Sequence, residues 1–468
     1  MNRMPRCLIV LGFSATLAAA QKGDRVYTAD QSSNTVSVID PATNRLLGSI
    51  HLGEDVPAAL LPLYRGELLV HGLGFSPDHR TLDVVSIGSN SVTLIDTQTN
   101  TVKGKIYVGR SPHEAFFSPN GRELWVAVRG ENYVSVIDPV RRREIRRIET
   151  ANGPGMVFFR PDGRYAFVPS SFTPEMAVID TKSYRVVARV PQSSPFSPNL
   201  AVDAEEVWLT LKDTGRTQVV SARPPFRTLA VLETGPITNH VTFVDNDAGK
   251  FAYISVGGKD QVLVYRRHQG SSPPLVATIH TGDLPHGIWG SSDGLRVYVG
   301  LENGDAVQVI DALSNQVVET IPVGQLPQAL VYVGGATTSA EGTSNLKPLG
   351  PTGALHLELV PPVTSPSSAH ASVSINSLGL IDNLQVAVTG LEPGRQYRLV
   401  LIGGPQPQDL VSFKAGIGGV AIVQTFGPLK RHMSSPEGVK AWKLEVRDGD
   451  PGSGTLILEQ ARAPAITP

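Results

Sequence analysis

One short segment decides the fold, because it returns at nearly regular intervals along the chain. Its first copy reads Thr35-Val36-Ser37-Val38-Ile39-Asp40. Six further copies, the last two of them weaker, end at Asp96, Asp138, Asp180, Asp311, Ser221 and Arg266. After a first interval of 56 residues, neighbouring copies lie 41 to 45 residues apart. A repeat of this length is typical of propellers, solenoids and other arrays of small units.

Each repeat consists of four short strand patterns separated by turn signals. An apolar strand ends in a turn such as Phe117-Ser118-Pro119-Asn120-Gly121, and a second strand such as Glu123–Ala127 follows. The Val-Ile-Asp segment is the third strand, and a turn such as Thr43-Asn44 leads to the fourth. Four alternating strands joined by Pro, Asn and Gly turns are typical of a propeller blade. The four-stranded unit favours a propeller over a solenoid.

The two ends of the repeat array complete each other. The array begins with a second strand, Arg25–Asp30, and ends with an unaccompanied first strand, Gln328–Val333. Pairing these two strands would complete a seventh blade and remove the exposed sheet edges. The sequence therefore predicts an all-β chain with a seven-bladed propeller at residues 24–334, closed by its N- and C-terminal strands.

The N-terminus and the cysteine content predict an exported protein without disulfides. Arg3 and Arg6, the apolar run Leu8–Leu17 and the small residues Ala18–Ala20 are typical of a secretory signal peptide at residues 1–20. The run is too short to span a bilayer, and we expect no transmembrane segment. The only cysteine, Cys7, lies inside this signal, so the mature chain is expected to hold no thiolate metal site. We expect a periplasmic or extracellular location.

The overall charge bears on the partners. The formal net charge of -1 gives no basic field, which argues against nucleic acid as a partner. We expect a monomer whose partner is a protein, a component of the cell envelope or a small-molecule ligand.

The first blade also carries a resemblance to a known family. The segment Val26–Asp30 is followed by Asn34–Asp40 and by the turn Pro41–Asn44. It resembles the YVTN-repeat β-propellers, and within them the YncE-like group, over residues 24 to 335. The resemblance implies the fold and little about function, because its motif residues are structural. We expect the repeated aspartates to accept backbone hydrogen bonds in their turns.

A candidate site emerges where the first strand of each blade begins, at the mouth of the channel. In register, these seven positions are His71, His113, Gly155, Asn199, His240, His286 and Gln328. Neutral imidazoles suit copper, zinc, iron or nickel, whereas protonated ones bind anions, and both forms serve acid–base chemistry. The alternative is structural, with each histidine bonded to a neighbouring blade.

From this ring and the loops between second and third strands, we predict a ligand site at the channel mouth. Its residues are His71, His113, Asn199, His240, His286, Gln328, Arg129 and Lys259. The four histidines are the candidate metal ligands, and the sequence predicts no cofactor besides a transition metal there. The long first interval places an insertion within Gly53–Val70, next to His71, which is either a functional loop or a surface elaboration.

The C-terminal part has the pattern of a separate module. Residues 335–351, rich in Gly, Ser and Thr, predict a flexible linker. Alternating segments over residues 352–462 predict a small β-sandwich. The segment Leu391–Tyr397 resembles the tyrosine corner of fibronectin type III-like domains, which implies a docking or adhesion module.

The function predicted from these patterns is that of a binding or scaffold protein. The sequence holds no Gly-x-Ser-x-Gly elbow, no phosphate-binding Gly-Lys loop and no His-Glu-x-x-His helix. The alternative is a propeller enzyme, either a lactonase-like hydrolase or a metal-dependent oxidoreductase that uses the histidine ring. Single-stranded nucleic-acid binding is a third hypothesis, which the neutral charge does not support.

Overall fold

The computed structural model describes residues 23–53, 66–268, 270–338, 341–350, 353–377, 381–404, 406–430, 442–449, 454–461 and 465–466. The expected signal peptide, residues 1–20, and most of the insertion expected within Gly53–Val70 lie outside the described residues. Among the helices of the described part, none has the length and apolar character needed to cross a bilayer.

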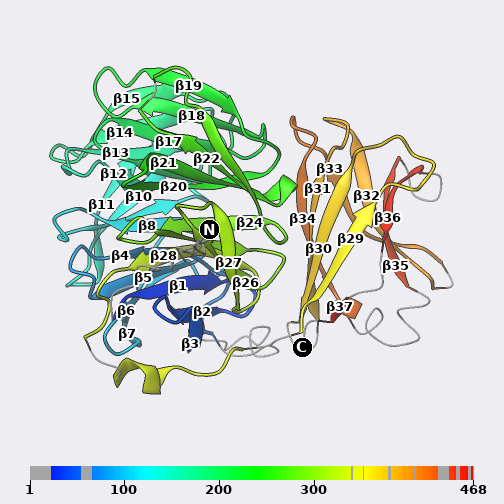
Figure 1. Ribbon diagram of the computed structural model, residues 1–468, viewed down its shortest axis with the longest axis horizontal. Coiled ribbons are helices and arrows are strands. Elements are labelled where there is room, and N and C mark those ends of the chain that lie inside the picture. Colours follow the sequence, from blue (N-terminus) through cyan, green and yellow to red (C-terminus); the bar gives the residue numbers. More distant parts are fainter. Residues whose placement is uncertain are drawn as a thin grey trace, which may run out of the picture.

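Seven four-stranded antiparallel sheets form the blades of a propeller (Figure 1). Blade 1 contains β4 (Val70–Phe75), β5 (Thr81–Ser86), β6 (Ser91–Asp96) and β7 (Thr101–Tyr107). Blade 2 contains β8 (Pro112–Phe117), β9 (Leu124–Val128), β10 (Tyr133–Asp138) and β11 (Arg143–Glu149). Blade 3 contains β12 (Phe158–Phe159), β13 (Tyr165–Pro169), β14 (Glu175–Asp180) and β15 (Arg185–Pro191).

The next three blades have the same order of strands. Blade 4 contains β16 (Leu200–Val202), β17 (Glu206–Leu211), β18 (Arg216–Ser221) and β19 (Thr228–Glu233). Blade 5 contains β20 (Thr238–Asn246), β21 (Gly249–Val256), β22 (Gln261–Arg266) and β23 (Leu275–His280), with the 3₁₀ turn η2 (Gly257–Lys259) before β22. Blade 6 contains β24 (Pro285–Gly290), β25 (Arg296–Leu301), β26 (Ala306–Asp311) and β27 (Gln316–Pro322).

Both ends of the repeat array build blade 7, as expected. Its strands run in the order β28 (Pro327–Val333), β1 (Arg25–Asp30), β2 (Thr35–Asp40) and β3 (Arg45–His51). Val26 of β1 lies opposite Tyr332 of β28 in an antiparallel ladder. The Tyr332 hydroxyl donates to Asp24, which also accepts the backbone N–H of Gly335 at 2.7 Å. The ring is therefore closed by non-covalent pairing, and the seven-bladed prediction is confirmed.

The repeated aspartates serve the turns, as the resemblance implies. Asp138 Oδ1 accepts the backbone N–H groups of Val140 at 3.0 Å and Arg141 at 2.8 Å. Asp180 and Asp311 accept equivalent pairs of backbone donors. These carboxylates therefore hold the turn between the third and fourth strands.

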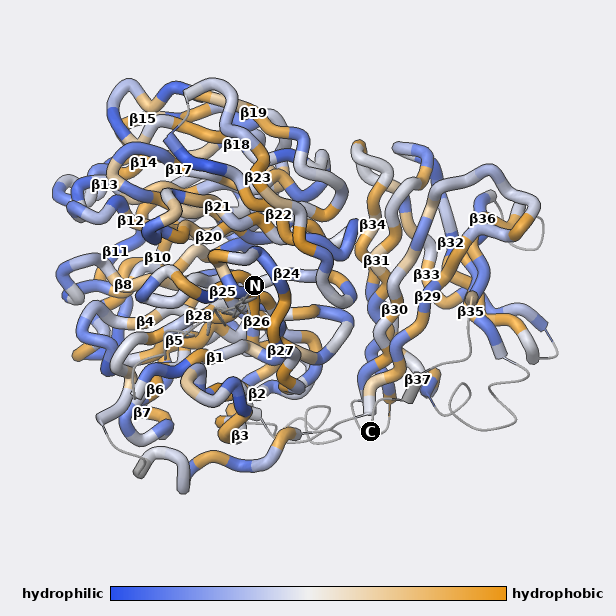
Figure 2. The backbone as a smooth tube through the Cα atoms, in the orientation of Figure 1, coloured by the Kyte–Doolittle hydropathy of each residue, from blue (hydrophilic) through white to orange (hydrophobic). Residues whose placement is uncertain are grey.

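The tryptophans occupy two kinds of position. Trp125 and Trp208 are fully buried, and each contacts an aromatic ring of the following blade, Phe159 and Phe243 respectively. Trp289 has a different position. Its ring contacts Phe75, Phe116 and Phe158 from the inner strands of three other blades, across the channel. Figure 2 shows apolar residues along the strands and hydrophilic ones at the outer turns.

The C-terminal module is a single rolled sheet, not two separate sheets. Its strands are β29 (Leu355–Val360), β30 (His370–Ser377), β31 (Asp382–Thr389), β32 (Gln396–Ile402), β33 (Gln408–Lys414), β34 (Ala421–Gly427), β35 (Lys443–Asp448), β36 (Leu456–Gln460) and β37 (Ala465–Ile466). The terminal strands of the sheet, β33 and β34, contact each other, so the module is barrel-like. The Tyr397 hydroxyl accepts the backbone N–H of Glu392 at 3.0 Å, which is the hydrogen bond expected of a tyrosine corner.

The C-terminal module packs against the propeller with β30, β31 and β34 nearest to it (Figure 1). Asn303 Nδ2 donates to Ser372 Oγ at 2.8 Å, and Gln385 Nε2 donates to Glu302 Oε1 at 2.6 Å. The segment that connects the two modules, residues 334–354, is bound to the propeller at Lys347. Lys347 pairs with Ser49 of β3 through two backbone hydrogen bonds. The connecting segment includes the 3₁₀ turn η3 (Glu341–Asn345).

Candidate functional site

One backbone device places all four histidines of the predicted ring. In β4, β8, β20 and β24 the pairing with the second strand shifts register at the residues around the histidine. Two residues before His71, His113 and His286, a non-glycine residue has a left-handed φ of 57°, 48° and 55° respectively. Bulges of this kind re-aim side chains, and here they turn the imidazoles toward the channel mouth.

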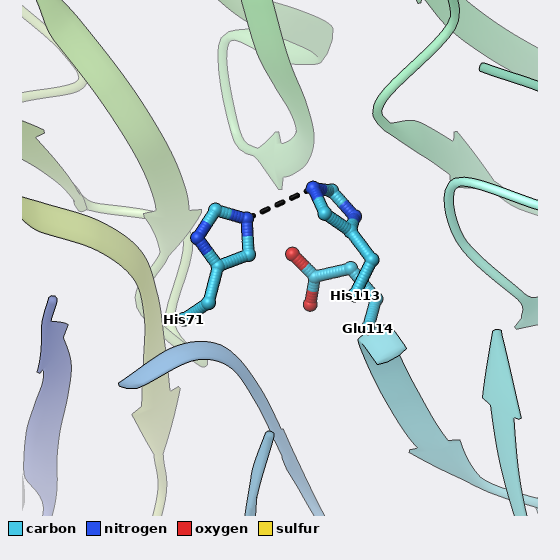
Figure 3. Close-up of side chains that lie close together, drawn as sticks. All are labelled: His71, His113 and Glu114. Atoms are coloured by element: carbon cyan, nitrogen blue, oxygen red, sulfur yellow. Dashed lines mark hydrogen bonds between the residues drawn. The ribbon is translucent and has the colours of Figure 1, made fainter. Parts of the chain in front are cut away.

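The four imidazoles form a connected chain. The ring centroids of His113 and His71 lie 4.4 Å apart, those of His71 and His286 lie 6.3 Å apart, and those of His286 and His240 lie 4.6 Å apart. His71 Nε2 and His113 Nε2 are hydrogen-bonded at 2.9 Å (Figure 3). All four side chains are buried. The structure thus brings the predicted histidines together.

Neighbouring groups define which ring nitrogens carry hydrogen. His113 Nδ1 and His286 Nδ1 face the carbonyl oxygens of Gly155 at 2.6 Å and Gln328 at 2.9 Å. Because a carbonyl only accepts, both Nδ1 atoms donate, and in the neutral rings both Nε2 atoms keep a lone pair. This Nε2 lone pair of His113 accepts the N–H of His71 Nε2.

His240 has the opposite arrangement. Asn199 Oδ1 accepts the Val241 N–H at 3.0 Å, so its Nδ2 amide faces His240 Nδ1 at 3.3 Å and donates to it. The hydrogen of a neutral His240 is then on Nε2, and this atom has no partner among the described residues. His240 is therefore presented as a hydrogen-bond donor, not as a metal ligand.

Burial and two nearby cations keep the imidazoles neutral. Burial is the largest cause that lowers the pKa of His71 and His113, and the Arg129 guanidinium is the next. The pKa of His240 falls to about 3 through burial and then through Lys212. Burial, followed by His240 and Lys212, also lowers the pKa of His286. Neutral imidazole is the form that ligates metals and accepts hydrogen bonds.

A chamber of about 550 Å³ lies over this chain of histidines. The predicted residues His71, His113, His286, Gln328 and Arg129 line it. Its roof belongs to the C-terminal module, which contributes Gln385, Val420, Ala421, Ile422 and Gln424. We call this space the mouth chamber. It is a cavity between two modules, and such junctions commonly hold ligands.

The remaining predicted residues lie elsewhere. Asn199 and His240 line a second, smaller cavity of about 190 Å³ deeper in the channel, together with Trp289. Lys259 is exposed on η2 and lines neither cavity.

The predicted set of site residues leaves out three groups that face these cavities. Lys212 and Glu302 come from the same type of loop as Arg129 and line the mouth chamber. Burial lowers the pKa of Lys212 to about 8, while Glu302 opposes this shift. Glu114 lines the deeper cavity, where burial and then Asp83 raise its pKa well above the ordinary value. The loop register that gives Arg129 also gives Lys212 and Glu302, but nothing in the sequence marks the roof.

One subset of these side chains has the donor atoms of a metal site. Atoms of His71, His113 and Glu114 all lie within 4.8 Å of one another, and Figure 3 shows the Glu114 carboxylate near both rings. The four predicted histidines do not form such a group with one another among the described residues.

The fold and the mouth define a seven-bladed propeller whose channel mouth is capped by a second β module. The sequence matches no protein-family model and no curated protein. Three of the solved structures that this chain resembles illustrate the propeller fold. Hydrazine synthase of Kuenenia stuttgartiensis is 20% identical over 63% of this chain and 94% of that chain, with a TM-score of 0.53. A Desulfotomaculum acetoxidans protein of unknown function is 12% identical over 66% of this chain and 98% of that chain, with a TM-score of 0.56.

The third structure is the periplasmic gluconolactonase PpgL of Pseudomonas aeruginosa. It is 20% identical over 66% of this chain and 99% of that chain, with a TM-score of 0.52. These shares of the chain are about the size of the propeller. At such identities, the likeness establishes the fold alone.

Proposed function

We propose that this protein is an exported binding propeller that holds a small organic anion in the mouth chamber. One observation carries the proposal. The chamber contains two cationic side chains, Arg129 and Lys212, for which the described residues supply no hydrogen-bond or salt-bridge partner. Glu302 and Asp213 also line the chamber, and Glu302 acts on the pKa of Lys212, but neither cation is bonded to a carboxylate among the described residues. Cationic donors that are left unbonded in a partly enclosed cavity can bind an anionic guest.

The walls suit a ligand with one charged end. The Arg129 guanidinium lies 5.0 Å from the centre of the Phe196 ring, within the range of a cation–π contact. A planar guanidinium can then bind a carboxylate through two parallel hydrogen bonds. Gln385 and Gln424 are hydrogen-bonded to each other in the roof at 2.7 Å and supply neutral polar contacts. Phe196 and Ile422 supply apolar ones.

Calorimetric titration of the mature protein with succinate, gluconate and inorganic phosphate tests this proposal. We expect one-site binding of a carboxylate, and about a tenfold or larger loss of affinity in Arg129→Gln and in Lys212→Gln. Lys259→Gln is the matched control, because it removes a cation outside the chamber. Equal affinity in the wild type and the Arg129→Gln/Lys212→Gln double variant would overturn the proposal, as would absence of binding to the whole panel.

The second candidate is a propeller enzyme, either a lactonase-like hydrolase or a metal-dependent oxidoreductase. It is supported by the neutral imidazoles of His71, His113 and His286 in a partly enclosed chamber, where they are available for proton transfer or ligation. PpgL, which shares the propeller fold, is itself a gluconolactonase. Turnover of glucono-lactone that is lost in His113→Gln would favour the enzyme. Stoichiometric binding of gluconate without lactone turnover would favour the binding protein.

The remaining proposals concern family and location. We propose that the chain is a YncE-like member of the YVTN-repeat propellers, with a propeller at 24–334, a linker at 335–351 and a fibronectin type III-like module at 352–462. We also propose a monomer in the periplasm or outside the cell, and PpgL is a periplasmic protein with the same propeller fold. Mass spectrometry of the mature N-terminus and sedimentation analysis test cleavage after residue 20 and the monomeric state.

A further inference from the structure

Three side chains between the mouth chamber and the deeper cavity have donor atoms that converge. They are His71 of β4, His113 of β8 and the adjacent Glu114. Their exposed fractions are 5%, 2% and 2%, so water does not solvate them freely. Two blades contribute to the group, and the packing of inner strands β4 and β8 brings them together.

The hydrogen bond between the two imidazoles occupies the place that a metal ion bound to both nitrogens would take. His71 Nε2 and His113 Nε2 lie 2.9 Å apart. Two imidazoles at the Zn–N distance of about 2.0–2.1 Å in a tetrahedral site have nitrogens about 3.3 Å apart. A shift of a few tenths of an ångström would therefore convert the N–H···N bond into two metal–nitrogen bonds.

The groups behind the two rings permit this exchange. His113 Nδ1 donates to the Gly155 carbonyl, and such an outer hydrogen bond is typical of metal-ligating histidines. His71 Nδ1 faces the side-chain amide of Gln31 at 3.1 Å. Rotation of this amide presents its oxygen in place of its nitrogen, so His71 can move its proton from Nε2 to Nδ1. Both imidazoles can then ligate through Nε2 while they stay neutral.

Glu114 supplies an independent observation that points to a ligand. Its Oε1 atom is buried and has no hydrogen-bond partner among the described residues. An unpartnered buried carboxyl oxygen is costly, and a bound cation would remove this cost. The residues that follow the other three histidines are Gly72, Val241 and Gly287, so this position carries a carboxylate only after His113.

We propose that His71, His113 and Glu114 bind one divalent first-row transition-metal ion, with Zn²⁺ as the reference ion. Two imidazoles and a carboxylate are the donor set of three-ligand zinc sites, which leave a fourth position open. Both imidazoles line the mouth chamber and Glu114 lines the deeper cavity, so the three ligands lie between the two spaces. This inference goes beyond the proposed function, because the ion can be bound whether or not an organic anion enters.

Equilibrium dialysis of the metal-free mature protein against Zn²⁺ or Co²⁺ tests the site. We expect one ion per chain and a visible Co²⁺ spectrum of low coordination number, which Zn²⁺ abolishes. Glu114→Gln and His113→Ala should each weaken binding by about 100-fold or more. His280→Ala, which removes an exposed histidine of β23, and His240→Asn should both keep the stoichiometry of one.

Two outcomes would overturn the site. One is a wild-type protein that takes up no ion, and the other is a folded Glu114→Gln or His113→Ala variant that binds as tightly as the wild type. If neither variant folds, NMR of the Co²⁺-loaded wild type decides, since two imidazole N–H signals shifted by the paramagnetic ion are expected. Absence of any shifted imidazole signal would exclude histidine ligation. The anion titration is done without metal, so each proposal can fail alone.

Discussion

The channel mouth contains two pairs of histidines that share a backbone position and differ in chemistry. His71 and His113 have ring centroids 4.4 Å apart, and His240 and His286 have centroids 4.6 Å apart. The interplanar angles are also similar, at 50° and 53°. The first pair is joined by an N–H···N bond, whereas His240 Nε2 has no partner among the described residues.

The difference arises from the neighbours of each pair. A buried carboxyl, Glu114, follows His113 in the first pair, and a glycine, Gly287, follows His286 in the second. The amide of Asn199 bonds His240 Nδ1 and leaves Nε2 of His240 as a donor. The Gly155 carbonyl bonds His113 Nδ1 and leaves Nε2 of His113 as an acceptor. Similar backbone geometry thus supports a metal site at one pair and a donor position at the other. Substitutions at four places in the molecule test this contrast.

The largest expected effect concerns Asp30, which directly precedes Gln31, the partner of His71. Burial raises the pKa of Asp30 to about 7, while hydrogen bonds from Ser37 and Thr35 oppose the rise. Between the ordinary pKa near 4 and pH 7 the folded state binds more protons than the unfolded state, so stability falls as pH rises through this window. A shift of this size corresponds to a loss on the order of 4 kcal/mol.

Asp30→Asn should remove this loss. Urea denaturation of both proteins at pH 4 and pH 8 measures it: the variant should gain relative to the wild type at pH 8. A constant difference between the two proteins across the window would contradict the raised pKa. Asn199 and Gln328, which face the Nδ1 atoms of the second pair, have no acidic residue next to them in the sequence.

The second prediction concerns the glycines that follow His71 and His286, where adding a side chain should reduce the stability of the fold equally at both pairs. A Cβ added to Gly72 would lie 2.3 Å from the His113 carbonyl oxygen, and one added to Gly287 would lie 2.3 Å from the Gln328 carbonyl oxygen. Because backbone must move in both cases, Gly72→Ala and Gly287→Ala should each cost roughly 3 kcal/mol of stability. Thermal melts check this, with Gly270→Ala, at an open left-handed position, as the comparison. An unchanged stability in Gly72→Ala would show that the two blades are packed less closely than these distances require.

A smaller effect separates the cations that act on the two pairs. Lys212 is the charged group that lowers the pKa of His240 after burial, and Arg129 is not among the causes. Lys212→Gln should therefore raise the pKa of His240, and Arg129→Gln should leave it unchanged. NMR titration of the His240 ring protons measures both. Equal changes in the pKa of His240 in the two variants would contradict this, because they would show that Arg129 and Lys212 affect His240 equally.

The smallest effect concerns Lys259, which is exposed and lines neither cavity. Lys259→Ala should change the stability by less than about 0.5 kcal/mol and leave anion affinity at the mouth unchanged. Calorimetric titration with the tightest carboxylate of the panel checks this. A tenfold loss of anion affinity in this variant would show instead that Lys259, on η2, contacts the ligand.

Sequence alone determined the propeller, because each blade forms from contiguous residues and repeats the same turn chemistry. The third strands ending at Asp138 and Asp311, and the two halves of blade 7, follow from spacing and from the need to pair sheet edges. The common position of the four histidines follows from the same register.

The chemistry of the site depends on contacts between distant parts of the chain. Which ring nitrogen carries hydrogen depends on carbonyl and amide groups of other blades, such as Gly155 for His113 and Asn199 for His240. The roof of the mouth chamber comes from Gln385 and Ile422, which lie far along the chain and meet the mouth only when the modules dock. A repeat pattern records the contacts within a blade, whereas contacts between blades and between modules depend on three-dimensional packing that has no fixed spacing in the sequence.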